Sequence, residues 1–107
     1  MIWKTLSDMN EFEAALEASY NNPIALYKHS TRCSISLIAK KSIERFWDLD
    51  IDAYYLDLIA HRDISNAIAE KLSIQHQSPQ IILVKEGAAV YDASHGAIDL
   101  VKMSEYL

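Results

Sequence analysis

The chain has a single cysteine, Cys33, among its 107 residues, and only two glycines and two prolines. One thiol excludes an intramolecular disulfide framework, so any disulfide that Cys33 forms must join it to another molecule. Two glycines cannot build the glycine-rich loop with which many proteins hold phosphates. Because half of the residues are apolar and so few are glycine or proline, the composition predicts a packed domain rather than a disordered chain.

Basic residues and long apolar runs are also scarce. The 10 basic and 15 acidic residues give a formal net charge of -5, without the basic surface that typifies nucleic-acid-binding proteins. No run of about 18 apolar residues is present, and the N-terminal residues lack the apolar core of a signal peptide. We therefore expect one domain over residues 1–107, located in the cytoplasm, with neither nucleic acid nor a membrane as its partner.

The spacing of apolar residues predicts alternating strands and helices. Strands are expected at 2–6, 24–28, 53–57, 81–84 and 88–91, the last two joined as a hairpin. Helices are expected at about 8–20, 34–47, 63–72 and 98–106, and the second should carry one stripe made of Ile35, Ile38, Ser42 and Phe46. The order β-α-β-α-β-α-β-β-α predicts an α/β fold with a central mixed sheet flanked by helices.

Cys33 lies at the expected junction between a strand and the helix that begins at Ser34. A helix N-terminus favours the thiolate over the thiol, and the thiolate is the form that attacks disulfides. Arg32 and Ser36 can add a positive charge and a hydroxyl donor beside the sulfur. A buried structural thiol is the alternative, but the polar neighbours, which also include Thr31, favour a reactive cysteine.

Two motifs carry a resemblance to a known family. The stretch His29-Ser30-Thr31-Arg32-Cys33-Ser34-Ile35-Ser36 resembles the His-Ser-Thr-x-Cys-Pro-Ile-Ser motif of the monothiol bacilliredoxins, the YtxJ-like family, and so does the later run Gln77-Ser78-Pro79-Gln80. The resemblance covers essentially the whole chain and implies a thioredoxin-like fold with a cis peptide bond before Pro79. It implies Cys33 as the catalytic residue, with a substrate-binding surface of Thr31, Arg32, Ser34, Ser36, Ser78, Pro79 and Gly96.

The resemblance also implies an activity. Bacilliredoxins remove bacillithiol, a low-molecular-weight thiol, from mixed disulfides on cytoplasmic proteins. Attack by Cys33 on the small-thiol sulfur would release the client protein, and a second small thiol or a separate partner would then restore Cys33. No metal and no tightly bound cofactor are expected. The small thiol would be a co-substrate, and S-thiolated proteins would be the partners. Arg32 would bind a malate carboxylate of bacillithiol, or else face solvent.

The chain departs from its relatives at two positions. Ser34 replaces the family proline after the cysteine, and Ser36 stands where dithiol thioredoxins have their second cysteine, so dithiol reduction is not expected. A non-catalytic module that binds a peptide beside Pro79 therefore stays an alternative. A glutaredoxin-like iron–sulfur protein is a weaker one, since those proteins carry Cys-Gly-Phe-Ser.

Two further features of the motifs stay open at this point. His29 or His95 is a candidate proton donor to the sulfur, although exposed loop histidines are common. Gly96 either forms the third wall of the substrate groove, as the resemblance implies, or only relaxes a turn before the last helix.

Overall fold

The computed structural model describes residues 1–107 and confirms the predicted order of elements. The strands and helices are β1 (Trp3–Thr5), α1 (Met9–Ala18), β2 (Ile24–His29), α2 (Ser34–Phe46), β3 (Asp52–Asp57), α3 (Arg62–Leu72), β4 (Gln80–Lys85), β5 (Ala88–Ser94), a 3-10 turn η1 (His95–Ala97) and α4 (Leu100–Ser104). The last helix has only five residues and is shorter than expected. None of the helices has the length and apolar content that a membrane crossing requires.

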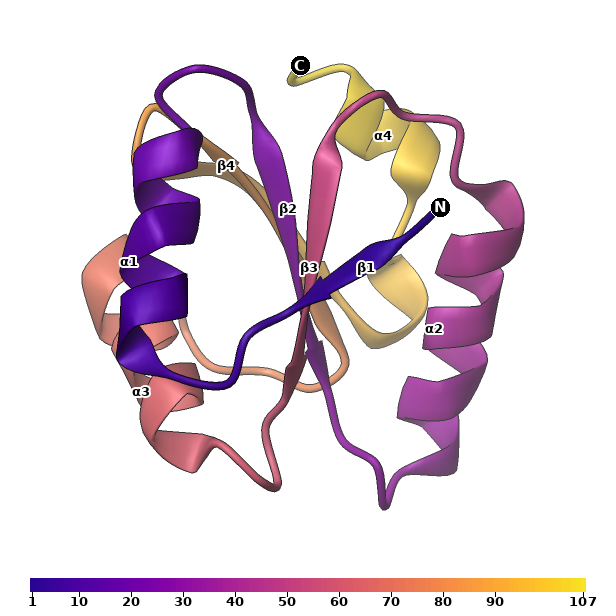
Figure 1. The fold of residues 1–107 in the computed structure, drawn as a ribbon. Coiled ribbons are helices and arrows are strands. Elements are labelled where there is room, and N and C mark those ends of the chain that lie inside the picture. Colours follow the sequence, from indigo (N-terminus) through magenta and orange to yellow (C-terminus); the bar gives the residue numbers. More distant parts are fainter.

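The five strands form one mixed sheet in the order β1-β3-β2-β4-β5. Strands β1 and β2 run parallel to β3, whereas β4 pairs antiparallel with both β2 and β5. Helices α1 and α3 cover one face of the sheet, and α2 and α4 cover the other (Figure 1). Because β2 is central and covered on both faces, all six of its residues are buried, including Lys28 and His29.

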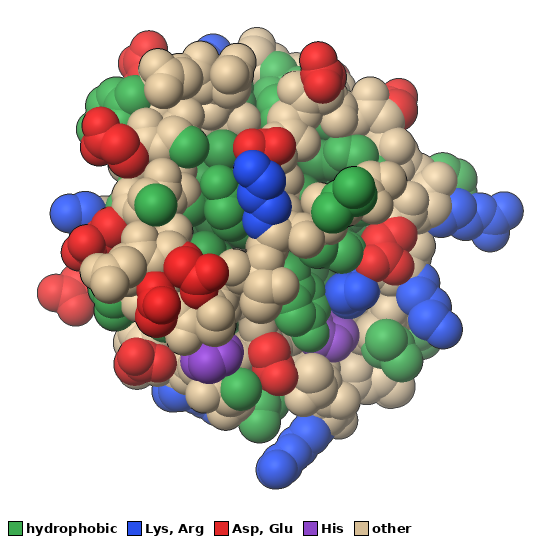
Figure 2. All heavy atoms as spheres, viewed as in Figure 1, with side chains coloured by type: hydrophobic (Ala, Val, Ile, Leu, Met, Phe, Trp, Pro, Cys, Tyr) green, Lys and Arg blue, Asp and Glu red, His purple; other side chains and the backbone are tan.

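Two apolar cores lie on the two faces of this sheet. The core under α1 and α3 includes Phe12, Ile64 and Ile68, all at most 1% exposed. The core under α2 and α4 is smaller and includes Tyr27, Ile43 and Met103. On the face drawn in Figure 2, acidic and basic side chains are interspersed, without a continuous basic patch.

The four residues of the predicted α2 stripe share one face of the helix, but that face is turned away from the sheet. Ile35, Ile38 and Phe46 are 58%, 67% and 62% exposed, whereas Ser36 and Ile43, seven residues apart on another face, are buried. The spacing of three or four residues identifies a stripe but does not determine which stripe meets the sheet. Hydrogen bonds of Ser36 to the end of β2 hold its face inward. In the same way α4 buries Met103 and leaves Val101 73% exposed.

Candidate functional site

Cys33 is the residue that immediately precedes α2, and it is partly exposed. Its backbone is extended, with φ -114° and ψ 119°, and its N–H donates to the Ser30 carbonyl at 3.1 Å. Its own carbonyl accepts the Leu37 N–H at 3.1 Å, which is the first hydrogen bond of the helix. A tight turn thus delivers the thiol to the N-terminal end of a 13-residue helix, where unpaired backbone donors favour an anion.

The predicted residues on either side of Cys33 form an exposed rim. Thr31, Arg32 and Ser34 are all exposed. Arg32 takes part in neither of the two ion pairs of the chain, so its guanidinium is available to a ligand. These three side chains can meet a substrate that approaches the sulfur from solvent, and Arg32 is the one suited to a carboxylate.

Ser36 lies beneath the turn rather than on this rim. It is 0% exposed, and its Oγ accepts the Ser30 N–H at 3.0 Å and is hydrogen-bonded to His29 Nδ1 at 2.9 Å. The Tyr27 hydroxyl donates to the Ser36 carbonyl at 2.8 Å. The serine that replaces a second cysteine therefore ties the last residues of β2 to the first turn of α2.

The groups around Ser36 are held in uncharged forms. Burial, with a contribution from the Lys40 charge, lowers the pKa of His29, so its ring is neutral at pH 7. Burial raises the pKa of Tyr27 to about 12, which keeps its hydroxyl a donor. The His29 ring packs between the rings of Tyr27 and Tyr55, with centroids 5.9 and 5.5 Å away. His29, a candidate proton donor to the sulfur, is thus part of the buried cluster that holds the turn before Cys33 in place.

We expect Ser36→Ala to lower the free energy of unfolding by about 1.5 kcal/mol, because the Ser30 N–H and His29 Nδ1 would lose their partner. The matched control is Ser34→Ala, at an exposed position two residues away, with an expected change within about 0.5 kcal/mol. Urea unfolding of both variants measures the difference. Equal stabilities would contradict the role of the buried hydroxyl.

The second motif lies at the same edge of the sheet as the first. Lys28 of β2 pairs with Gln80 of β4, which sets Pro79 beside the end of β2 that leads to Cys33. The Ser78–Pro79 peptide bond is cis, and Pro79 is buried. The Pro79 carbonyl accepts the His95 N–H at 3.0 Å, and the buried Ser78 Oγ has no hydrogen-bond partner.

Gly96 belongs to η1, which packs against α2. Gly96 is exposed, and a Cβ placed on it would meet nothing within 4 Å. His95, not Gly96, has the positive φ of this turn, at 53°. A glycine is therefore not needed to relax this turn, and Gly96 and His95 instead lie on the open surface next to the start of α2.

A buried polar cluster lies behind the Pro79 loop, and the sequence patterns did not predict it. Lys28 is 0% exposed, and its Nζ donates to the Ser65 carbonyl at 3.2 Å and lies 3.1 Å from His76 Nδ1. Burial lowers the pKa of Lys28 to about 8. Burial and the nearby Lys28 charge also lower the pKa of His76. The signal that could have revealed it is a lysine within a strand that is otherwise buried on both faces.

Gln80 holds the same loop from its other end. Its side-chain nitrogen donates to the Gln75 carbonyl at 3.2 Å and to Asp92 at 3.3 Å, and its side-chain oxygen accepts the Gln77 N–H at 3.3 Å. The loop that carries Ser78 and Pro79 is thus anchored to two strands of the sheet. No group of three or more His, Cys, Asp or Glu residues is arranged to hold a metal ion.

Comparison with known proteins gives a consistent result. The family model described as "Monothiol bacilliredoxin BrxC" matches residues 4–103. A solved protein described as a proposed oxidoreductase with a thioredoxin fold is 33% identical, with a TM-score of 0.84 over 95% of this chain and 90% of that chain.

Two thioredoxins are similar at lower identity. The Malassezia sympodialis protein is 13% identical, with a TM-score of 0.75 over 97% of this chain and 86% of its own. The Schistosoma mansoni protein is 22% identical, with a TM-score of 0.72 over 96% of both chains. The architecture is a thioredoxin fold, as the sequence predicted.

Proposed function

The chain belongs to the monothiol bacilliredoxin family, and from this premise we propose that it removes bacillithiol, or a similar low-molecular-weight thiol, from mixed disulfides on client proteins. It is a thiol oxidoreductase by family and fold. The observation that carries the proposal is the position of its single thiol, which is partly exposed at the start of α2 with no second cysteine to resolve an adduct. We place the reaction in the cytoplasm, where protein thiols are kept reduced.

In the first step the Cys33 thiolate attacks the small-thiol sulfur of the mixed disulfide. The bond between that sulfur and the client sulfur breaks, and the client leaves as a thiolate that takes a proton from water. Cys33 now carries the small thiol in a new disulfide. The backbone N–H groups at the start of α2 and the Arg32 guanidinium are placed to attract the anionic groups involved.

In the second step a free small thiol, as its thiolate, attacks the adduct and leaves as a symmetric small-thiol disulfide. The two electrons that reduce the client sulfur thus come from the two small-thiol molecules that end as the symmetric disulfide. Cys33 returns to its starting form. Because Ser36 occupies the place of a resolving cysteine and is hydrogen-bonded below the turn, no internal disulfide can compete. The adduct should therefore persist until an external thiol arrives.

This persistence supplies the test. We expect that reduced protein mixed with an S-bacillithiolated client, without free bacillithiol, releases one equivalent of client and gains one bacillithiol at Cys33, both read by intact-mass spectrometry. A client carrying glutathione at the same cysteine is the matched comparison, and slower transfer from it supports bacillithiol as the preferred group. Client binding without any adduct would refute the exchange reaction and favour the non-catalytic module.

A further inference from the structure

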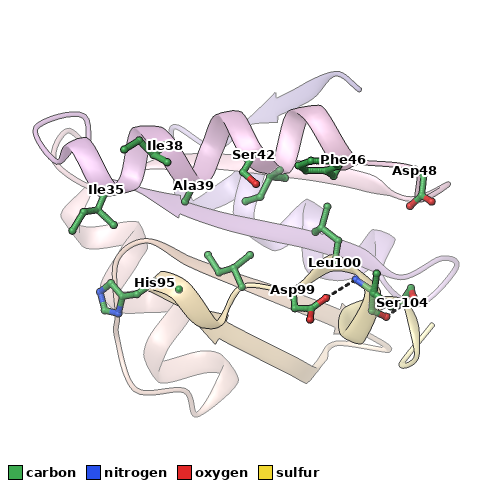
Figure 3. A pocket seen from close by; sticks show the side chains of 14 residues that line it. Ile35, Ile38, Ala39, Ser42, Phe46, Asp48, His95, Asp99, Leu100 and Ser104 are labelled. Atoms are coloured by element: carbon green, nitrogen blue, oxygen red, sulfur yellow. Dashed lines mark hydrogen bonds between the residues drawn. The ribbon is translucent and has the colours of Figure 1, made fainter.

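A long apolar groove begins next to the reactive cysteine and continues away from it. It has a volume of about 880 Å³ and is lined by 14 residues, of which eight are hydrophobic. Helix α2 forms one side, and η1 with α4 forms the other (Figure 3). Ile35, which follows Cys33 by two residues, and His95 lie at one end of the groove, whereas Asp48 and Ser104 lie at the far end. The exposed stripe of α2 is thus one wall of a concave surface.

The charged groups of the groove have one sign. Asp99 lies partway along it and Asp48 at its far end, and no lysine or arginine lines it. The Asp99 carboxylate is fixed in place because it accepts the N–H groups of Val101 and Lys102 at 2.9 and 3.2 Å. Arg45, with its guanidinium 5.3 Å from the Phe46 ring, is outside the lining.

A mixed disulfide consists of a small thiol and a client protein, and the charges of the groove favour the client as the half that enters it. The small thiol expected here bears malate carboxylates, which would be repelled by two aspartates in an apolar setting and attracted to Arg32 on the exposed rim. An apolar polypeptide segment with a basic residue has the complementary character. Since the groove starts two residues after Cys33, a chain that presents its cysteine to this thiol can continue into it.

We propose that the groove binds the client protein, as a segment that is apolar next to its modified cysteine and carries a lysine or arginine further along. This inference rests on the proposed exchange reaction and adds the specificity of its protein substrate. The 12 residues from Ile35 to Phe46 span about 16 Å of helix. An extended segment covers that length in about five residues. Cys33 and Asp48 lie two residues beyond the two ends of this stretch, so the basic residue lies about six or seven residues from the cysteine, opposite Asp48.

The test uses S-bacillithiolated peptides with an apolar segment and with lysine about six or seven residues before or after the cysteine, and matched peptides with glutamate there. A small disulfide of bacillithiol and N-acetylcysteine measures the exchange reaction with no peptide segment to occupy the groove. We expect Ile38→Asn to lower kcat/KM for the lysine peptide about five-fold, since Ile38 is 67% exposed and lines the groove. The matched control is Leu37→Asn, 47% exposed on the same helix but outside the groove, which should change little.

Asp48→Asn tests the charge. We expect it to remove most of the preference for lysine over glutamate peptides and to leave the small disulfide unaffected. Equal effects of Ile38→Asn and Leu37→Asn, or no preference for the lysine peptides, would overturn the groove proposal alone. No turnover of the small disulfide by the unaltered protein would instead refute the exchange reaction.

Self-association is the rival use of the same surface. Analytical ultracentrifugation of the unaltered protein and of Ile38→Asn distinguishes it. A monomer in both cases supports the client segment as occupant, whereas a dimer that Ile38→Asn dissociates, with peptide kinetics unchanged, would assign the groove to a second copy of the chain.

Discussion

Replacing Cys33 with serine is expected to reduce the release of bacillithiol from a client to the uncatalysed rate, a loss of at least about 10³-fold. A serine hydroxyl stays protonated at neutral pH and is a poor nucleophile toward sulfur, whereas the proposed first step requires a thiolate. No other side chain can substitute, because the chain has no second cysteine. The measurement is the initial rate of client release, followed by intact-mass spectrometry.

Stability and binding measurements on the same variant separate loss of chemistry from loss of fold. Cys33 is partly exposed and makes no side-chain capping hydrogen bond, so the free energy of unfolding should change by no more than about 0.5 kcal/mol. Client binding should also persist. Full client release by Cys33→Ser would refute the enzymatic role, and a folded variant with unchanged cellular function would indicate a binding module.

The second large effect is expected in the pH dependence of stability, through Lys28. Its pKa is about 8 in the folded protein, against an ordinary value of 10.5, because burial disfavours the ammonium form. Between these two values the unfolded chain binds the proton and the folded chain does not. The free energy of unfolding should therefore rise as the pH is raised through this window. Lys28 alone is expected to contribute a gain of about 2 kcal/mol between pH 8 and pH 10.

Other groups that titrate near Lys28 act outside this window or in the opposite direction. His76, which faces the Lys28 ammonium, has its pKa lowered from 6.5 by burial, so its contribution changes below pH 7. Burial raises the pKa values of Tyr55 and Tyr91 from 10 and that of Tyr27 to about 12, so these phenols begin to lower stability as the pH approaches 10. The interval from pH 8 to pH 9 thus reports chiefly on the lysine.

Lys28→Met is the matched variant, because methionine fills similar space without a charge. Urea unfolding at intervals of pH from 7.5 to 10 should show the rise in the unaltered protein and a nearly flat profile in the variant. An equal slope in both proteins would show that another group is responsible. A flat profile in both would mean that the ammonium is solvated within the folded protein.

Much of the fold was predictable from local patterns. Three runs of β-branched or aromatic residues alternate with segments whose apolar residues have helical spacing. This local order is enough to place β2, β3 and β4 and the helices between them. The position of Cys33 at the start of α2 followed from the same boundary. The roles of Thr31, Arg32 and Ser34 toward a substrate stay predictions, made on an exposed rim that the structure places around the thiol.

Residue type and spacing alone therefore determined the element order and the single thiol at a helix start, since each depends on neighbours along the chain. The mixed sheet followed from that order, because strands joined through a helix pair in parallel and strands joined by a tight turn pair antiparallel. The tertiary structure decided three things. It turned Ser36 inward onto His29, left Ile38 and Phe46 as the wall of a groove, and buried Lys28 against α3 and the loop that carries His76. The physical reason is that these contacts join residues on different elements, and a helical stripe or a single lysine carries no information about which distant surface it will meet.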